Sequence, residues 1–216
     1  MKGIIFDMDG TMINNMMVHH RAWQRKLSEL GMEMSLEEVH QKVHGVNTEI
    51  LKRLFGDRYT LEERQKISAE KEIEYRTIFE PELELLAGLP ELIHELKGKN
   101  IPMGIGSAAP PENVAFVMNH LNLWHYFDTV RHSDDVTHGK PNPEIYQIVL
   151  HDLDIEPEDC IVFEDTPTGA EAAQRAGCKT IVVTTTHSPE EFEDNKSVVR
   201  FISDFSEINA AELLNF

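Results

Sequence analysis

The sequence is poor in cysteine and has no long apolar run. Its only cysteines, Cys160 and Cys178, both lie in apolar contexts, so we interpret them as small core residues rather than a disulfide or a metal pair. No apolar segment reaches the length of a transmembrane helix, and Asp7 and Asp9 interrupt the short apolar run near the N-terminus, which argues against a signal peptide. These features predict a cytoplasmic protein without a membrane partner.

Basic residues are also scarce. The chain of 216 residues carries 20 lysines and arginines against 38 aspartates and glutamates, which gives a formal net charge of −18. Such a surface repels nucleic acids and anionic membranes, so no nucleic-acid partner is expected. It also repels phosphorylated ligands, so a phosphate-binding site would have to supply its own cations. The hydrophobic fraction of 41% is ordinary for a globular protein with a buried core.

The secondary-structure pattern changes twice along the chain. Residues 3–6 predict a short buried strand, and helix signals dominate from about Met16 to Phe79. After Pro81 strands and helices alternate, which predicts crossover connections and an α/β fold with a doubly wound, mostly parallel sheet. An all-helical domain is therefore inserted after the first strand of an α/β core. We expect the core domain at residues 1–14 and 82–216 and the helical cap domain at 15–81.

Helix-capping signals support this division. Ser35 with Glu38, and Thr60 with Glu63, have the spacing of a capping box, and Asn47 can cap the helix that follows it. The strands of the core are expected at residues 3–6, 101–107, 127–133, 160–165, 180–186 and 200–205, with a final helix at 208–216.

Polar side chains gather where these strands end. Because ligands of an open parallel sheet bind beyond the carboxyl ends of its strands, the side chains should converge on one crevice. Clustered carboxylates repel one another unless a cation lies among them, and carboxylate oxygens together with water suit Mg²⁺. The residues are Asp7 and Asp9 after the first strand, Ser107 after the second, Glu164 and Asp165 at the end of the strand at 160–165, and Lys140 in a loop before a helix.

These residue types suit phosphoryl transfer. Asp7 can attack phosphorus and form an aspartyl phosphate. Asp9, two residues further along an extended segment, can protonate the leaving oxygen and then activate a water. Ser107 can donate to a phosphate oxygen, and Lys140 can neutralise charge on the phosphoryl group and on Asp7. Because phosphoryl transfer depends chiefly on positioning and electrostatic stabilisation, this set is sufficient in principle.

Four motifs in order along the chain resemble those of the haloacid dehalogenase superfamily of phosphotransferases. They are "DMDGT" at 7–11, Ser107 after an apolar strand, Lys140 in "KPNPEIY", and "FEDTPTGAEAAQRAG" at 163–177. The helical insert resembles the small cap of the subgroup that contains β-phosphoglucomutase and related sugar-phosphate phosphatases. The resemblance covers essentially the whole chain.

The resemblance implies a role for each motif residue. Asp7 would be the nucleophile and Asp9 the general acid and base. The phosphate-binding residues would be Ser107, Ala108 and Lys140. The Mg²⁺ ligands would be Asp7, Asp9 through its backbone carbonyl, and Asp165, with Glu164 beside them. Haloacid dehalogenases themselves lack the second aspartate and need no metal, so Asp9 argues against dehalogenation.

Each residue also has a simpler structural interpretation. Ser107 could cap the next helix, Lys140 could be a solvated loop charge, and the Glu164–Asp165 pair could form a turn before a helix. The histidines of the insert could suggest zinc, but their spacing matches no familiar ligand pattern, so solvated or packed histidines are the alternative. These histidines are His19, His20, His40 and His44.

The insert should act as a hinged lid that sets specificity, because two neighbouring segments, near 14–17 and 80–83, join it to the core. His19 and Trp23 are four residues apart and share a helix face. That face starts just after the first motif, so we expect it to look into the crevice and to contact substrate.

One stretch of the insert departs from the resemblance. β-Phosphoglucomutases carry a Lys-Gly-x-Ser-Arg stretch here, whereas this chain has His44, Asn47 and Thr48 in place of the Lys, Ser and Arg. Loss of a bidentate, permanently charged arginine should weaken the grip on a second phosphate. Lys52 and Arg53, one turn later, could compensate.

Three functions follow from these residues. The first is a Mg²⁺-dependent phosphatase of a small phosphorylated metabolite, with a sugar phosphate as the expected substrate. The second is a β-phosphoglucomutase-like isomerase that interconverts sugar phosphates through a bisphosphate. The third is a non-enzymatic module that accepts phosphate or senses a metabolite, as receiver domains do, although those lack a helical insert and a paired acid/base. We expect a monomer, with a homodimer as the alternative.

Overall fold

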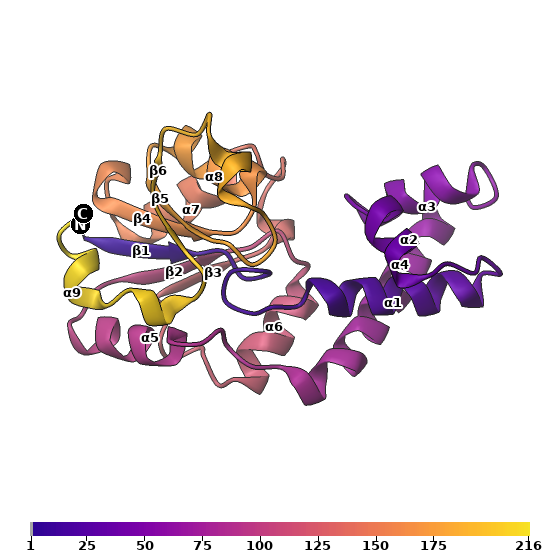
Figure 1. The fold of residues 1–216 in the computed structure, drawn as a ribbon, viewed down its shortest axis with the longest axis horizontal. Helices are drawn as coiled ribbons and strands as arrows, with labels where there is room; N and C mark the ends of the chain where they lie inside the picture. The colour runs from indigo at the N-terminus through magenta and orange to yellow at the C-terminus, as the bar shows by residue number, and fades with distance from the viewer. Residues whose placement is uncertain (1) are drawn as a thin grey trace. The chain divides into compact units, whose positions relative to one another are not determined.

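The structure is a computed structural model that describes residues 2–216. The described chain divides into two compact units (Figure 1). The α/β unit contains the residues up to Asn14 together with Leu83–Phe216, and the helical unit contains Asn15–Glu82. These bounds lie within one residue of the domain boundaries expected from the sequence.

The described residues of the α/β unit form a six-stranded sheet in which every pair of neighbouring strands is parallel. The strand order is β3-β2-β1-β4-β5-β6. This order confirms the predicted doubly wound sheet and puts β1 at the point where the order reverses. The strands are β1 (Gly3–Phe6), β2 (Met103–Gly106), β3 (Thr129–Arg131), β4 (Cys160–Glu164), β5 (Lys179–Val183) and β6 (Val198–Ile202).

Helices cover both faces of this sheet, as Figure 1 shows. On one face lie α7 (Glu144–Leu153) and α8 (Pro167–Ala176). On the other face lie α5 (Leu89–Gly98), α6 (Pro111–His120) and the short α9 (Ala210–Leu213). Short 3-10 turns complete the described chain at Glu80–Glu82, Ser133–Asp135, Pro157–Asp159, Pro189–Phe192 and Phe205–Glu207.

The alternation of side chains along β1 and β4 builds a core on each face of the sheet. Ile5 and Val162 pack into the cluster that contains the buried faces of α7 and α8. Phe6 and Phe163 point to the opposite face, where their rings stack with centroids 5.1 Å apart and both lie against Phe205. The central strands are therefore buried on both faces, which holds their carboxyl ends in fixed positions.

Strand register brings the expected site residues to one edge of the sheet. Phe6 of β1 is level with Ile105 of β2 and with Phe163 of β4. Asp7, Ser107 and Glu164 therefore follow at neighbouring points along the carboxyl edge of three adjacent strands.

The helical unit contains four α-helices among its described residues. They are α1 (Met16–Glu29), α2 (Leu36–Lys42), α3 (Asn47–Phe55) and α4 (Leu61–Phe79). The predicted capping boxes at the start of α2 and α4 are confirmed, because Ser35 and Thr60 each accept from the backbone N–H three residues later. The predicted cap of α3 is wrong: Val46 occupies the cap position, and the Asn47 side chain donates instead to Oε1 of Glu72 at 2.7 Å.

Three predicted elements at the C-terminal end of the chain are longer than the observed ones, and one of them, the strand expected at 200–205, spans Val198–Ile202 instead. β5 ends at Val183, so the threonines at 184–186 lie beyond the strand. Val183 pairs with Ile202, the last residue of β6, and the chain turns where Thr185 N donates to the Val183 carbonyl. β-Branched threonines favour a strand locally, but here the strand ends with its partner. The final helix spans only Ala210–Leu213 instead of 208–216.

Within residues 2–216, no helix combines the length and the apolar composition needed to cross a membrane.

Candidate active site

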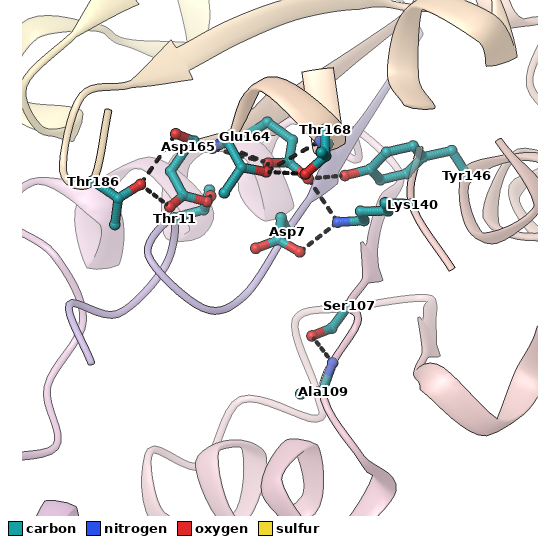
Figure 2. Close-up of polar contacts among 12 residues, drawn as sticks. Asp7, Thr11, Ser107, Ala109, Lys140, Tyr146, Glu164, Asp165, Thr168 and Thr186 are labelled. Carbon is teal, nitrogen blue, oxygen red and sulfur yellow. Dashed lines mark hydrogen bonds and ion pairs between the residues drawn. The ribbon is translucent and has the colours of Figure 1, made fainter. Parts of the chain in front are cut away.

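A buried ion-paired cluster lies at the carboxyl end of β1 (Figure 2). Nζ of Lys140 lies 2.6 Å from Oδ1 of Asp7 and 2.6 Å from Oε1 of Glu164. The side chains of Lys140 and Asp7 are each 8% exposed, and that of Glu164 is 1% exposed. The interpretation of Lys140 as a solvated loop charge is therefore wrong, because its ammonium group lies between two buried carboxylates.

Glu164 is held by more donors than Lys140 alone. Its Oε1 accepts from the hydroxyl of Tyr146 at 2.6 Å, and its Oε2 accepts from the backbone N–H groups of Asp165 and Thr166 at 3.0 and 3.1 Å. The hydroxyl of Thr166 adds a bond at 3.1 Å and also caps α8 by accepting from the N–H of Gly169. Glu164 is therefore fixed at the base of the cluster, where it orients Lys140.

Asp165 has its own set of donors. The Thr11 hydroxyl donates to its Oδ1 at 3.2 Å and the Thr186 hydroxyl donates to its Oδ2 at 2.5 Å (Figure 2). Gly10 packs directly against this carboxylate, and a Cβ at position 10 would lie 2.1 Å from Oδ2. Gly10 also has a φ of +79°, so both its backbone angle and this close approach require glycine.

Neither Glu164 nor Asp165 serves as a helix-terminal acid. Both carboxylates are buried, and Thr166 takes the N-cap position of α8 instead. The interpretation of the pair as an ordinary turn before a helix is therefore wrong.

The electrostatics of the cluster favour a bound cation. Burial raises the pKa of Asp7 well above its usual range, and Lys140 offsets this only in part. Burial and the charge of Glu164 raise the pKa of Asp165 to about 7. Burial also opposes the charged forms of Lys140 and Glu164, but ionic attraction outweighs it: the charges of Asp7 and Glu164 raise the pKa of Lys140, and the charge of Lys140 lowers the pKa of Glu164. Three carboxylates thus share one ammonium group.

The donor set fits a hard divalent cation. Among residues 2–216, Asp7, Glu164 and Asp165 form the one group of three or more ligand-type side chains whose ligand atoms all lie within 4.8 Å of one another. Carboxylate oxygens are the ligands that Mg²⁺ prefers. None of the four histidines of the helical unit belongs to this group, so the structure gives no support to the zinc interpretation.

Asp9 lies outside that group, so only three of the four expected carboxylates cluster. It is half-buried in the loop after β1, where Gly10 N donates to the Ile13 carbonyl at 2.8 Å and Met12 N donates to the Met8 carbonyl at 2.9 Å. Asp9 itself forms an isolated parallel bridge with Ile13, and the chain turns from Gly10 onward.

Ser107 and Ala108 follow β2, the neighbour of β1. Ser107 is buried and its Oγ accepts from the N–H of Ala109 at 3.1 Å, which leaves the hydroxyl proton for a phosphate oxygen. Ser107 does not cap the next helix, because Pro110 occupies that position. Ala108 is exposed.

The helical unit contains a second polar cluster, centred on the buried Lys71. Its Nζ lies 2.7 Å from Nδ1 of His19 and 2.9 Å from Oε1 of Glu72, and it lies over the ring of Trp23 at 5.7 Å from the centroid. The His19 ring stacks on Tyr75 with centroids 3.9 Å apart. His19, Trp23 and, through Glu72, Asn47 are thus brought together within this unit.

The other two candidate substrate residues of the helical unit, His44 and Thr48, form hydrogen bonds outside the Lys71 cluster. His44 is exposed and its carbonyl accepts from Arg53, whereas the carbonyl of Thr48 accepts from Arg64 at 3.1 Å. Whether these side chains contact substrate stays a prediction.

Sequence reasoning missed Thr11, Thr186, Tyr146 and Lys71. A buried tyrosine usually finds a hydrogen-bond partner, so Tyr146 on the inner face of α7 carried a usable signal. Lys71 interrupts the buried stripe of α4 at four-residue spacing, between Ile67 and Tyr75, and a lysine in such a stripe needs a partner. The partners of Thr11 and Thr186 are 154 and 21 residues away, so no local pattern identifies them.

Known proteins resemble this chain over most of its length. The family model of the haloacid dehalogenase-like hydrolases matches residues 1–177. A phosphorylated carbohydrates phosphatase of Thermotoga maritima is 32% identical over 186 residues, which cover 84% of each chain. A β-phosphoglucomutase of Bacillus subtilis is 28% identical over 188 residues, covering 82% of this chain and 80% of the mutase.

A solved structure gives the same fold. The crystal structure of a haloacid dehalogenase-like hydrolase of family IA, variant 3, from Entamoeba histolytica superposes with a TM-score of 0.90 at 28% identity, and covers 100% of this chain and 98% of that one. The resemblance inferred from the four motifs is thereby confirmed. The chain belongs to the haloacid dehalogenase-like hydrolase family.

Proposed function

We propose that this protein is a Mg²⁺-dependent phosphatase that hydrolyses a small phosphorylated metabolite, with a sugar phosphate as the expected substrate, through an aspartyl phosphate on Asp7. The observation that carries the proposal is the buried Asp7 carboxylate, 2.6 Å from Lys140 and clustered with Glu164 and Asp165 at the carboxyl end of β1. The name of the similar Thermotoga maritima phosphatase supports phosphorylated carbohydrates as the substrate class. Membership in a hydrolase family favours an enzyme over the non-enzymatic module.

In the first half-reaction, an oxygen of Asp7 forms a bond to phosphorus as the bond from phosphorus to the leaving alkoxide breaks. Asp9 gives its proton to the leaving oxygen, so the alcohol departs neutral. In the second half-reaction, Asp9 takes a proton from a water that attacks the same phosphorus. The bond between phosphorus and Asp7 breaks, inorganic phosphate leaves, and both aspartates return to their starting states.

The other residues bind charge and hold geometry. The ammonium of Lys140 neutralises Asp7 before the attack and the phosphoryl oxygens after it. The hydroxyl of Ser107 and the backbone N–H of Ala108 donate to phosphate oxygens. The metal would be held by Asp7, the carbonyl of Asp9 and Asp165, beside Glu164. When bound, Mg²⁺ supplies positive charge that offsets the negative charge of the phosphoryl group and of the carboxylates.

The helical unit is proposed to act as a cap that selects the non-phosphate part of the substrate. The half-buried His19, Asn47 and Glu72 at the margin of the buried Lys71 cluster support this role, because hydroxyl-rich ligands need donors and acceptors on a firmly packed surface. His19, Trp23 and Asn47 belong to this cluster, and His44 and Thr48 remain candidates from the sequence.

The cations of the helical unit favour a phosphatase over a mutase. The guanidinium of Arg53 donates to the backbone carbonyls of Lys42 and His44, each at 2.9 Å. Lys52 pairs with Asp57, and Lys71 pairs with Glu72. The two cations that could compensate for the missing arginine, Lys52 and Arg53, thus already have partners, as does the buried Lys71, which disfavours a second phosphate. The similarity to a β-phosphoglucomutase keeps the isomerase as the alternative.

One experiment separates these functions. Phosphate release is measured with Mg²⁺ across a panel of sugar phosphates, nucleotides and pyrophosphate, with β-glucose 1-phosphate tested with and without glucose 1,6-bisphosphate. We expect release from one or several monophosphates. Glucose 6-phosphate formed only in the primed reaction, with no phosphate release, would establish the mutase instead.

A further inference from the structure

The threonine run at 184–186 lies beyond β5 and makes three separate contacts. Thr184 Oγ1 donates to the carbonyl of Ile202 at 3.2 Å, away from the carboxylate cluster. Thr185 Oγ1 donates to the carbonyl of Gly10 at 2.5 Å. Thr186 Oγ1 lies 2.5 Å from Oδ2 of Asp165 and 3.2 Å from the carbonyl of the same residue. Two of the three hydroxyls therefore connect the segment after β5 to the candidate active site, through hydrogen bonds to Gly10 and Asp165.

We propose that Thr186 is a positioning residue that fixes the rotation of the Asp165 carboxylate for a divalent cation. The inference rests on the proposed function, because it takes Asp165 as a metal ligand. Thr186 itself touches neither substrate nor phosphate in this scheme, and acts only through Asp165.

The direction of the hydrogen bonds follows from proton counting. A threonine hydroxyl has one proton, and the shortest contact of Thr186 is to Oδ2 of Asp165, a carboxylate oxygen that can only accept when ionised. The same hydroxyl lies 2.9 Å from Nδ1 of His187. Since its proton is already donated to Asp165, the Thr186 oxygen accepts from His187, which then carries a proton on Nδ1. The hydroxyl is thereby held in one orientation.

The Asp165 carboxylate is consequently fixed on both of its oxygens. Thr11 donates to Oδ1 and Thr186 to Oδ2, as Figure 2 shows, while Gly10 packs against the carboxylate at a distance that leaves no room for a Cβ. A carboxylate held in this way keeps one orientation. Its oxygens would therefore always present the same lone pairs to a divalent cation bound beside Asp7 and Glu164. Groups that orient metal ligands typically contribute about 10- to 100-fold to metal affinity.

The test measures metal binding rather than turnover. Mn²⁺ is used as the probe, and its binding to the purified full chain is followed through the electron paramagnetic resonance signal of the free ion. Thr186→Val removes the hydroxyl at nearly constant volume and should weaken Mn²⁺ binding ~10-fold or more. Thr186→Ser restores the hydroxyl and should bind within about threefold of wild type, if the hydroxyl rather than the methyl group matters.

Thr184→Val is the matched control, because it removes a hydroxyl of the same run that bonds to β6, and it should bind Mn²⁺ as wild type does. If Thr186→Val does not fold by circular dichroism, Thr186→Ala replaces it in the comparison with Thr186→Ser. Wild-type Mn²⁺ affinity in the folded variant that lacks the hydroxyl would overturn the inference.

Asp165→Asn separates this inference from the proposed function. Loss of Mn²⁺ binding in Asp165→Asn together with wild-type binding in Thr186→Val would contradict the positioning role alone. Undiminished binding in Asp165→Asn, or no binding by wild type, would contradict the metal site itself. As a second readout, saturating Mg²⁺ should return kcat of Thr186→Val to within a few-fold of wild type, because only metal affinity is impaired.

Discussion

Nζ of Lys140 lies 2.6 Å from Oδ1 of Asp7, although 133 positions separate the two residues in the chain. Both side chains are nearly inaccessible to water, so their attraction is poorly screened. Burial raises the pKa of Asp7 well above its usual range, and the attraction to Lys140 favours the ionised form that the proposed nucleophile needs. This relationship makes Lys140 the most informative residue for substitution.

Lys140→Met should reduce kcat/KM by ~10² or more, because it removes the one ammonium group of the cluster. It should also lower the free energy of unfolding by about 3–5 kcal/mol, since it leaves Asp7 and Glu164 buried without a counterion. Urea unfolding and phosphate release measure the two effects. Lys97→Met is the control, because the Lys97–Asp128 pair is exposed at the surface and should contribute at most about 1 kcal/mol. Equal stability of the two variants would contradict the buried ion pair.

Asp7→Asn should abolish turnover and leave the fold intact. The carboxamide cannot form the acyl phosphate, whereas removal of one negative charge relieves repulsion from Glu164 and Asp165. We therefore expect a thermal midpoint no lower than that of wild type. Asp57→Asn, at a side chain 94% exposed, is the matched control and should keep full activity. Residual turnover in Asp7→Asn would exclude the covalent mechanism.

Asp9→Asn should slow both half-reactions by ~10² to 10⁴, the usual contribution of a general acid and base. An aryl phosphate with a good leaving group distinguishes the two steps, because its leaving oxygen needs no proton. With that substrate the variant should form the phosphoenzyme at nearly the wild-type rate and hydrolyse it slowly. Rapid-quench detection of accumulated phosphoenzyme checks this expectation. A steady-state rate within a few-fold of wild type would assign the acid and base role to another group.

Gly169→Ala should destabilise the protein, although glycine-to-alanine changes in helices usually stabilise. A Cβ at this position of α8 would lie 1.8 Å from Oε1 of Glu164, which is fixed by Tyr146 and Lys140. We expect a loss of about 1–3 kcal/mol from overpacking, together with reduced turnover.

Gly98→Ala is the matched control for this substitution. Gly98 lies at the end of α5 and a Cβ there meets no atom within 4 Å, so stability should be unchanged or rise by about 0.5–1 kcal/mol. Both values come from denaturant unfolding. If both variants are stabilised, the close packing of α8 on Glu164 is not a constraint.

His19 should remain neutral well below the usual pH range of histidine. Burial and then the neighbouring Lys71 lower the pKa of His19 to about 3, from 6.5 in an unfolded chain. Because the ammonium of Lys71 can only donate, Nδ1 of His19 accepts and its proton lies on Nε2. Nitrogen NMR of the imidazole should show this neutral tautomer at pH 5. A signal of the protonated ring there would contradict the arrangement.

The shift also sets the sign of a pH effect on stability. Between pH 6.5 and about 3 the unfolded chain binds a proton at His19 that the folded chain does not. The contribution of His19 to stability is therefore fully present above pH 6.5 and is lost as the pH falls through that window, by at most about 1.4 kcal/mol per pH unit. Comparison of the unfolding free energy of wild type with that of His19→Gln across this range isolates the effect.

Local patterns in the sequence were sufficient for the α/β class, the helical insert and most of the elements. Capping boxes and alternating apolar runs are short-range features, so Ser35 and Thr60 marked the start of two helices correctly. The same reasoning failed at Asn47 and at the threonines of 184–186. At Asn47 the side chain bonds to Glu72 instead of capping the helix, and at 184–186 the strand ends because its partner β6 ends at Ile202. Both causes lie outside the local sequence.

The sequence by itself determined which residues stand at the strand ends: Asp7, Ser107, Glu164 and Asp165 each follow an apolar run, and Lys140 precedes a helix. The tertiary structure decided which of them meet. Parallel pairing of β1 with both β2 and β4 brings segments about 100 and 160 residues apart to one edge, and burial there removes the water that would otherwise screen their charges. Asp9 lies outside the carboxylate group, whereas Thr186, just beyond β5, contacts Asp165 within it. Residue spacing predicts neither result, because packing sets the direction of the chain in a loop.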